Sequence, residues 1–213
     1  VEATTLGAKT NLDRHIRNMS AFGVPVVVSI NRFTSDTDAE LDAIAQAARD
    51  SGAISVCITE VHAHGGKGGK DLAEAVVKAV QNHVAAGRPF VPLFTPETDV
   101  LEKAESIAKR MYKADKLDVT PKAMRELERI RSWGYGHLPV CMAKTQYSFS
   151  HDASLLGAPT GFLIPVREFR LNAGAGFVVA VLGNMMTMPG LPKRPAALDM
   201  DMDEDGNLLG VFG

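Results

Sequence analysis

The sequence has few cysteines and no long apolar run. Its 213 residues include only two cysteines, Cys57 and Cys141, each inside an apolar or mixed stretch. Two such cysteines do not make a disulfide framework, so we expect a reducing compartment and a cytoplasmic protein. The longest apolar runs, residues 24–30 and 177–182, are far shorter than the roughly 18 to 20 residues that a membrane span needs. No signal peptide is recognisable, and we expect no membrane partner.

An excess of charge of one sign is also absent. There are 23 Lys and Arg against 25 Asp and Glu, which gives a net charge of −2 with both signs interspersed. Such a surface does not attract nucleic acid, so none is expected as a partner. Because 46% of the residues are hydrophobic, the chain can form one large or two modest domains. It starts at Val1 instead of methionine, which leads us to expect a fragment or a processed chain.

One stretch organises the chain, an almost unbroken β-branched run at residues 24–30 that leads into a polar turn at 31–37. The run predicts a strand buried on both faces of a parallel sheet. Asp36 or Thr37 can cap the helix that follows, and residues 54–58 form a second apolar strand, which completes a β-α-β unit. Ligands collect at the carboxyl ends of parallel strands, so a site is expected just after the first strand.

The predicted fold class is α/β with two lobes. Residues 1–108 should form a mostly parallel sheet with flanking helices, and residues 109–213 a mixed αβ domain. Four further elements support the second lobe and its connection. They are an amphipathic helix at 101–111, a helix after the Thr120-Pro121 cap, and strands at 161–171 and 176–182. Residues 90–94 predict an extended sheet edge.

A glycine-rich stretch lies between the second strand and a helix, where free backbone N–H groups favour an anion. Its spacing misses the phosphate-loop pattern, because only three residues separate Gly65 from Gly69 and Asp71 follows Lys70. We therefore exclude a nucleotide phosphate loop. A carboxylate or phosphate held by the glycines and Lys67 remains one interpretation, and a plain crossover loop remains the other.

The turn after the first strand resembles the guanine-reading motif of GTPases, with Arg32 in place of lysine and Thr34 in place of aspartate. Without the carboxylate, the guanine N–H groups lack an acceptor, so a GTPase-like binder is a weak alternative. Phe33 could stack on a flat heterocycle or fold back into the core.

Other polar patterns give no metal site. His62 and His64 would share a face only in an extended segment, and no further ligand stands at metal spacing. Asp201, Asp203 and Asp205 imitate half a calcium loop but lack its final glutamate, so Asp205-Gly206 predicts a turn instead. The donor-rich loops at 144–150 and 188–195 suit anion or substrate contact and a subunit interface equally well.

Several longer strings extend over nearly the whole chain, from about residue 7 to residue 212. They are Phe22-Gly23-Val24-Pro25, Ile30-Asn31-Arg32-Phe33, Gly65-Gly66-x-Gly68-Gly69, Leu156-Gly157-Ala158-Pro159, and residues 138–150 and 186–195. Together they resemble the carboxyl-terminal portion of formate-tetrahydrofolate ligase, also called formyltetrahydrofolate synthetase.

The resemblance implies an activity for the whole enzyme. The family joins formate to tetrahydrofolate with MgATP, through formyl phosphate, to give 10-formyltetrahydrofolate, ADP and phosphate. Its phosphate loop lies in a larger amino-terminal domain, so MgATP should bind mainly upstream of this segment, which alone should be inactive. The resemblance also implies a homotetramer and activation by a monovalent cation such as potassium.

The resemblance implies a pteridine pocket as well. The family uses a phenylalanine after the Asn-Arg pair, an aliphatic residue on the next strand and a tryptophan before the glycine loop. These positions fall on Phe33, Ile58 and His62, where histidine offers a smaller flat face than tryptophan. We infer that Gly65, Gly66 and Lys67 hold the folate glutamate tail. No catalytic residue is expected here, and the alternative function is a non-catalytic structural or oligomerisation fragment that lacks the ATP site.

Overall fold

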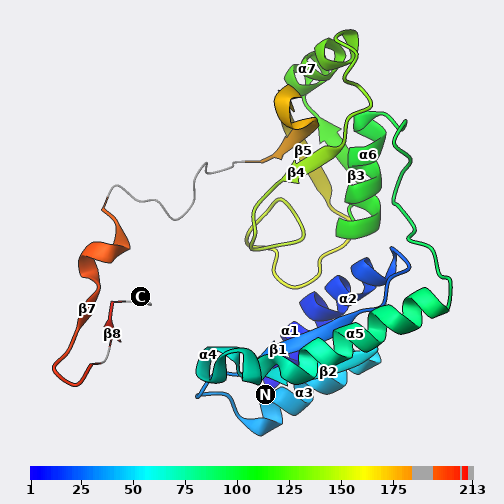
Figure 1. Cartoon of the computed structure of the whole chain (residues 1–213). Coiled ribbons are helices and arrows are strands. Elements are labelled where there is room, and N and C mark those ends of the chain that lie inside the picture. The colour runs from blue at the N-terminus through cyan, green and yellow to red at the C-terminus, as the bar shows by residue number, and fades with distance from the viewer. Residues whose placement is uncertain (184–193, 207, 211–213) are drawn as a thin grey trace. The chain divides into compact units, whose positions relative to one another are not determined.

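A computed structural model describes residues 1–183, 194–206 and 208–210. The chain forms two compact units, Val1–Gly183 and Asn184–Gly213, and each is described by itself (Figure 1). Most of the predicted loop at 188–195 lies outside the described residues. Within the described part, no helix has both the length and the apolar character needed to cross a membrane.

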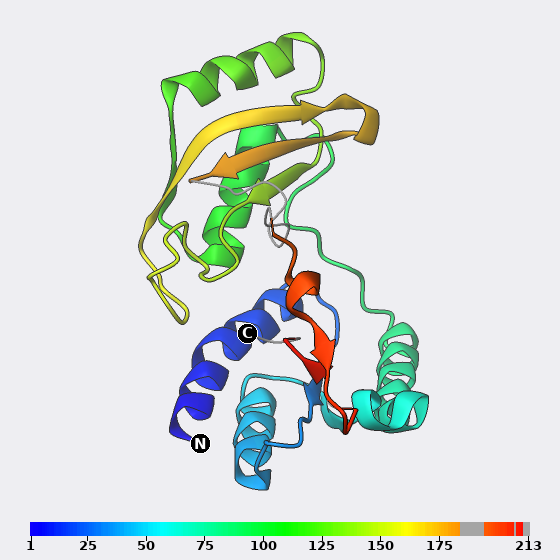
Figure 2. The ribbon, with the colours of Figure 1, turned by 90° about the vertical axis from the view of Figure 1, so that its left-hand side faces the viewer.

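The first lobe of the larger unit is a parallel β-α-β arrangement. Strands β1 and β2 pair in parallel, with Val27 opposite Ser55 and Asn31 opposite Thr59. Helices α3 and α5 flank the two strands (Figure 2). The elements are α1 (Glu2–Gly7), a π-helical turn (Ala8–Leu12), α2 (Asp13–Ser20), β1 (Val27–Asn31), α3 (Asp38–Asp50), β2 (Ser55–Thr59), α4 (Val61–His64), a 3-10 turn (Gly65–Gly69) and α5 (Lys70–Ala85).

The first strand differs from the sequence-based expectation. The helical segment that precedes it begins at Glu2. Strand β1 begins only at Val27, because Pro25 has no N–H to donate to a ladder. The strand was predicted to be buried on both faces, which is wrong, since Val28 and Ile30 are buried but Ser29 is exposed. Its buried side chains pack with those of α2 and α3, namely Ile16, Leu41, Ala45 and Ala48.

Helix α3 begins with the capping chemistry that the sequence indicated. Thr37 is the N-cap residue, and its side-chain oxygen accepts a hydrogen bond from the backbone N–H of Glu40. The Glu40 carboxylate accepts one in return from the Thr37 backbone N–H, at 3.2 Å. This reciprocal pair is a capping box, which fixes where the helix starts and therefore how long the turn after β1 is.

The second lobe holds a mixed four-stranded sheet in the order β3-β5-β6-β4. Strand β3 pairs with β5 in parallel, β5 with β6 antiparallel, and β4 with β6 in parallel. Its elements are α6 (Val100–Ile107), a π-helical turn (Ala108–Tyr112), β3 (Lys116–Val119), α7 (Pro121–Ser132), β4 (Val140–Ala143), β5 (Leu163–Asn172) and β6 (Phe177–Leu182). A parallel pair and a mixed sheet, both flanked by helices, confirm the predicted α/β class.

Each lobe has its own hydrophobic core. The core of the second lobe joins α6 and α7 to the sheet through buried residues that include Val100, Leu127, Ile164 and Val178. The lobe boundary near residue 108 stays a prediction. Residues 90–94, predicted as a sheet edge, form no strand and lead into α6.

A buried lysine connects this irregular segment to the second lobe. Lys103 on α6 is 1% exposed, and its ammonium donates to the backbone carbonyls of Pro96, His137 and Leu138. It also lies 5.6 Å from the centre of the Phe94 ring. One side chain thereby holds two segments that are far apart in sequence.

The smaller unit contains a short 3-10 helix, Ala196–Asp199, and a two-stranded antiparallel ribbon. Strands β7 (Asp201–Met202) and β8 (Leu208–Leu209) pair on either side of a turn in which Gly206 has φ of +82°. The predicted turn at Asp205-Gly206 is confirmed. Among the described residues, no group of three or more His, Cys, Asp or Glu side chains could hold a metal ion.

Candidate functional site

The carboxyl ends of β1 and β2 bring two predicted site segments together. The backbone N–H of Arg32 donates to the carbonyl of Thr59 at 2.9 Å, which extends the ladder one step past Asn31. Phe33 therefore follows directly beyond the last rung, and Ile58 sits one residue before Thr59 on the neighbouring strand. The predicted site residues on both strands lie at the end of the sheet where α/β proteins bind ligands.

A hydrogen-bonded turn presents the Phe33 ring. The backbone N–H of Phe33 donates to the Asp36 carboxylate at 2.8 Å, and the Asp36 N–H donates back to the Phe33 carbonyl at 3.1 Å. Arg32 forms an ion pair with Asp38 at 3.0 Å across the same turn. Phe33 is 58% exposed, so its ring does not fold back into the core. The turn leaves an aromatic surface open to a ligand.

The glycine-rich segment is helical, which the sequence did not predict. Residues 61–64 form α4 and residues 65–69 a 3-10 turn that runs into α5. Gly68 approaches the backbone of Glu60 so closely that a Cβ atom there would overlap its carbonyl group. The Glu60 N–H donates to the Gly68 carbonyl at 3.1 Å. Glycine at position 68 is therefore required by this close approach, and the segment is pinned beside the end of β2.

A cavity of about 580 Å³ opens at this edge, and we call it the Ile58 cavity. It brings together Ile58 and Lys67 from the predicted set. Phe33, His62, Gly65 and Gly66 do not line it, and all four are exposed. The complete lining is Ile58, Glu60, His64, Lys67, Gly68 and Asp71.

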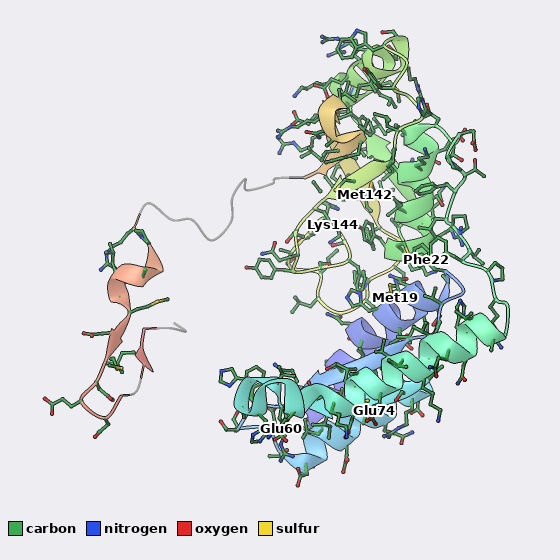
Figure 3. All side chains as sticks on the ribbon, viewed as in Figure 1. Met19, Phe22, Glu60, Glu74, Met142 and Lys144 are labelled. Carbon is green, nitrogen blue, oxygen red and sulfur yellow. The ribbon has the colours of Figure 1, made fainter. Side chains whose placement is uncertain are left out.

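Sequence reasoning missed three polar side chains of the Ile58 cavity. Glu60 follows β2 directly, His64 ends α4 and Asp71 lies in the first turn of α5 (Figure 3 labels Glu60). The signal that could have found Glu60 was its position just beyond a strand end. The two carboxylates outnumber the single ammonium of Lys67, so the cavity combines donors and acceptors and is not cationic.

The histidine pair does not form a metal site. His62 and His64 lie on helix α4, where residues two apart point in different directions, whereas the pair needed an extended segment. The helical backbone therefore separates the two imidazoles, which would share a face only in an extended segment.

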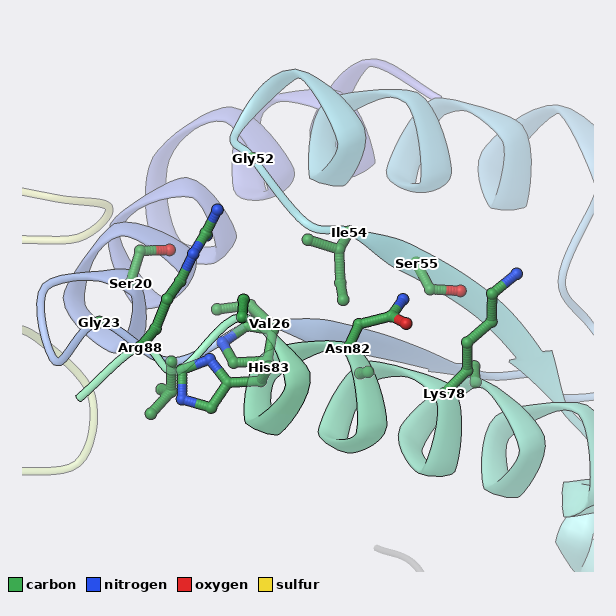
Figure 4. A pocket seen from close by; sticks show the side chains of 15 residues that line it. Ser20, Gly23, Val26, Gly52, Ile54, Ser55, Lys78, Asn82, His83 and Arg88 are labelled. Atoms are coloured by element: carbon green, nitrogen blue, oxygen red, sulfur yellow. The ribbon is translucent and has the colours of Figure 1, made fainter. Parts of the chain in front are cut away.

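A second cavity, of about 630 Å³, lies at the opposite end of the same sheet. Its lining includes Val26 and Ser55, at the amino ends of the strands, together with Asn82, His83 and Arg88 (Figure 4). We call it the amino-end cavity. None of the predicted folate residues lines it, because they lie at or beyond the carboxyl ends of β1 and β2.

Comparison with known proteins adds to this geometry. The sequence profile of the family described as formate-tetrahydrofolate ligase matches residues 1–212. The chain belongs to the formate-tetrahydrofolate ligase family. The match extends over the residues of both lobes and into the smaller unit, up to residue 212.

Curated relatives bear the same description. The formate-tetrahydrofolate ligase of Paracoccus denitrificans (strain Pd 1222) is 49% identical over 221 residues, covering 100% of this chain and 39% of the relative. That of Maricaulis maris (strain MCS10) is 50% identical over 202 residues, covering 95% of this chain and 36% of the relative. The chain thus spans little more than a third of the length of the ligases that it matches.

Proposed function

We propose that this chain supplies the tetrahydrofolate-binding part of an ATP-dependent formate-tetrahydrofolate ligase. The observation that carries the proposal is the exposure of two apolar side chains where the paired strands end. Phe33 is 58% exposed and Ile58 is 45% exposed. Exposed apolar side chains beside the carboxyl ends of parallel strands fit an aromatic ligand such as a pteridine.

In this proposal each residue of the site has a separate role. Phe33 stacks on the pteridine, Ile58 provides an apolar wall and His62 gives a partial stack. Lys67 and the backbone at Gly65 and Gly66 interact with the negative glutamate tail. The hydrogen bonds between Phe33 and Asp36 support the first role, because they order the turn before a ligand arrives.

The chemistry proposed for the whole enzyme has two steps. Formate attacks the terminal phosphorus of ATP to give formyl phosphate and ADP, and N10 of tetrahydrofolate then attacks the formyl carbon and displaces phosphate. MgATP binds mainly to residues upstream of this segment, and a monovalent cation such as potassium activates the enzyme. This segment positions tetrahydrofolate for the second step, so that N10 lies next to the carbon of formyl phosphate that it attacks.

We propose further that the enzyme acts in the cytoplasm as a homotetramer and that this segment alone does not turn over. Within the segment, residues 1–108 form the domain that carries the folate pocket, and residues 109–213 form the carboxyl-terminal αβ domain. The separate hydrophobic cores support two domains, although α6 (Val100–Ile107) packs in the core of the second one.

A chimeric ligase tests the proposal. The 213 residues would replace the matching part of the Paracoccus denitrificans ligase, to which they are 49% identical. We expect a chimera that makes 10-formyltetrahydrofolate, and a tetrahydrofolate KM that rises when Phe33 is replaced. A folded, active chimera whose folate KM does not respond to Phe33 would refute the assigned site.

A structural or oligomerisation role is the second candidate, and one surface favours it. Helix α5 exposes Val76, Val77, Val80 and Val84, each at least 43% accessible. An apolar stripe of this kind marks a protein contact more often than a solvated face. Titration of the chain with tetrahydrofolate separates the two candidates, since a purely structural segment would show no saturable binding.

A further inference from the structure

The loop after strand β4 contains a lysine that the proposed function does not use. Lys144, labelled in Figure 3, follows Ala143, the last residue of β4. It lines a cavity of about 170 Å³. We call this the Lys144 cavity. Its lining draws on three separate segments, with Asn11 and His15 from the amino-terminal helices, Tyr112 from the turn after α6, and residues 146–149 from the loop itself.

The ammonium of Lys144 is held but not neutralised. It donates to the backbone carbonyls of Thr145 and Ser148, and it lies 5.3 Å from the centre of the Tyr112 ring. An ammonium has three N–H donors, and these contacts use two of them. Neutral carbonyls and an aromatic face orient the charge but supply no negative partner.

Burial leaves this charge uncompensated. Desolvation lowers the pKa of Lys144, and no neighbouring carboxylate opposes that shift. Among the described residues, no Asp or Glu lines the cavity. A partly buried cation without a counter-ion is costly, so the site favours an anion that would restore the balance.

A second cation lies close to the same wall. The guanidinium of Arg14 sits 5.7 Å from the centre of the Phe149 ring, which lines the cavity. Its Nη1 is buried and has no hydrogen-bond partner within the described structure. The ring centre of His15 lies 4.8 Å from that of Phe149, and both residues line the cavity. Arg14 and Lys144 thus lie over two different rings of the cavity wall, Phe149 and Tyr112, and Arg14 itself does not line the cavity.

We propose that the Lys144 cavity binds a small oxyanion, a carboxylate or a phosphate group. Lys144 supplies the charge, and Asn11, His15, Gln146 and Tyr147 supply polar groups around it. The size of the cavity suits a group of a few heavy atoms better than a whole nucleotide, which pockets of roughly 300 Å³ or more accommodate. This inference does not rest on the proposed folate site, which uses a different end of the first lobe.

Calorimetric titration of the 213-residue chain with inorganic phosphate tests the proposal at fixed ionic strength. We expect one saturable site, and replacement of Lys144 by Met should weaken it at least about tenfold, as loss of a charge-assisted contact does. Lys144→Arg keeps the charge and should retain part of the affinity. Competition with formate distinguishes a carboxylate ligand from a phosphate ligand. Displacement of bound phosphate by formate indicates a site that accepts carboxylates, whereas phosphate that stays bound indicates a site for phosphate groups.

Lys78→Met is the matched control. Lys78 lines the amino-end cavity, so its replacement should leave phosphate binding unchanged. An NMR titration of the unmutated chain tests the proposal even if Lys144→Met fails to fold. Lysines are labelled by reductive ¹³C-methylation, and the Lys144 resonance is assigned by its absence in Lys144→Arg. The pH dependence of this resonance gives the pKa of the Lys144 amino group, which phosphate should raise. Absence of saturable binding, equal binding by folded Lys144→Met, or an unchanged Lys144 pKa at high phosphate would overturn the proposal.

Discussion

Replacement of Phe33 by alanine should remove much of the tetrahydrofolate affinity without unfolding the chain. A phenylalanine side chain buries roughly 150–250 Å² when fully covered, and 58% of Phe33 is accessible to a ligand. A pteridine that covers about half of that area contributes roughly 1–1.5 kcal/mol by burial, and stacking adds about 0.5–1.5 kcal/mol. We therefore expect a loss of roughly 2 kcal/mol, which is about thirtyfold in Kd.

Isothermal titration of the chain with tetrahydrofolate measures this effect, and urea unfolding checks the fold. Since Phe33 is exposed, the free energy of unfolding should change by less than about 0.5 kcal/mol. Phe33→Leu should recover part of the affinity, because it restores apolar area without a ring. Phe90→Ala is the matched control, because Phe90 is also exposed, at 60%, but lies away from the proposed folate site. Its ring stacks on that of Phe22, which precedes Gly23 in the lining of the amino-end cavity. This replacement should leave the tetrahydrofolate Kd unchanged. Equal Kd values for the parent chain and Phe33→Ala would refute the stacking role.

Three further predictions concern the site and the second lobe. His62→Trp should tighten tetrahydrofolate binding by about threefold to tenfold in the same titration, because a larger ring offers more stacking area. Asp99→Asn should lower the free energy of unfolding at pH 7 by roughly 1 kcal/mol in urea, since Asp99 both caps α6 and pairs with Arg131 at 2.6 Å. Lys103→Met should cost about 3 kcal/mol or more, because it leaves three backbone carbonyls without their donor.

The effect of Asp99 has a defined pH dependence. The hydrogen bond from Arg131 holds the pKa of Asp99 below its ordinary value, and the N–H of Leu101 acts in the same direction. A carboxyl with a lowered folded-state pKa stabilises the fold above its unfolded pKa of about 3.9 and loses that contribution as the pH falls. The difference between the parent chain and Asp99→Asn should therefore shrink between pH 5 and pH 3. A constant difference would contradict the ion-pair explanation.

Local chemistry explains what could be predicted from the sequence. Thr37 with Glu40 and Thr120 with Pro121 are capping signals that act within one turn, so the starts of α3 and α7 were predictable. The ends of β1 and β2 were also close to expectation, because apolar runs stop where polar residues begin. These signals sufficed to place Phe33 and Ile58 at the edge of the sheet.

The remainder depends on contacts between distant segments. Strands β3 and β4 have four residues each and carry no clear alternation, so only their pairing with β5 and β6 reveals them. The helical path of residues 61–69 follows from the approach of Gly68 to Glu60, which no pattern encodes. The grouping of Lys67 with Asp71 in one cavity results from that path.

The central claim is that Phe33 and Ile58 bind the pteridine of tetrahydrofolate. Saturation-transfer NMR on the 213-residue chain tests it most directly, with the Ile58 methyl groups and the Phe33 ring selectively labelled. The account predicts transfer from both side chains to the pteridine protons, and loss of the ring signal in Phe33→Leu. Saturable folate binding with transfer from neither residue would contradict it.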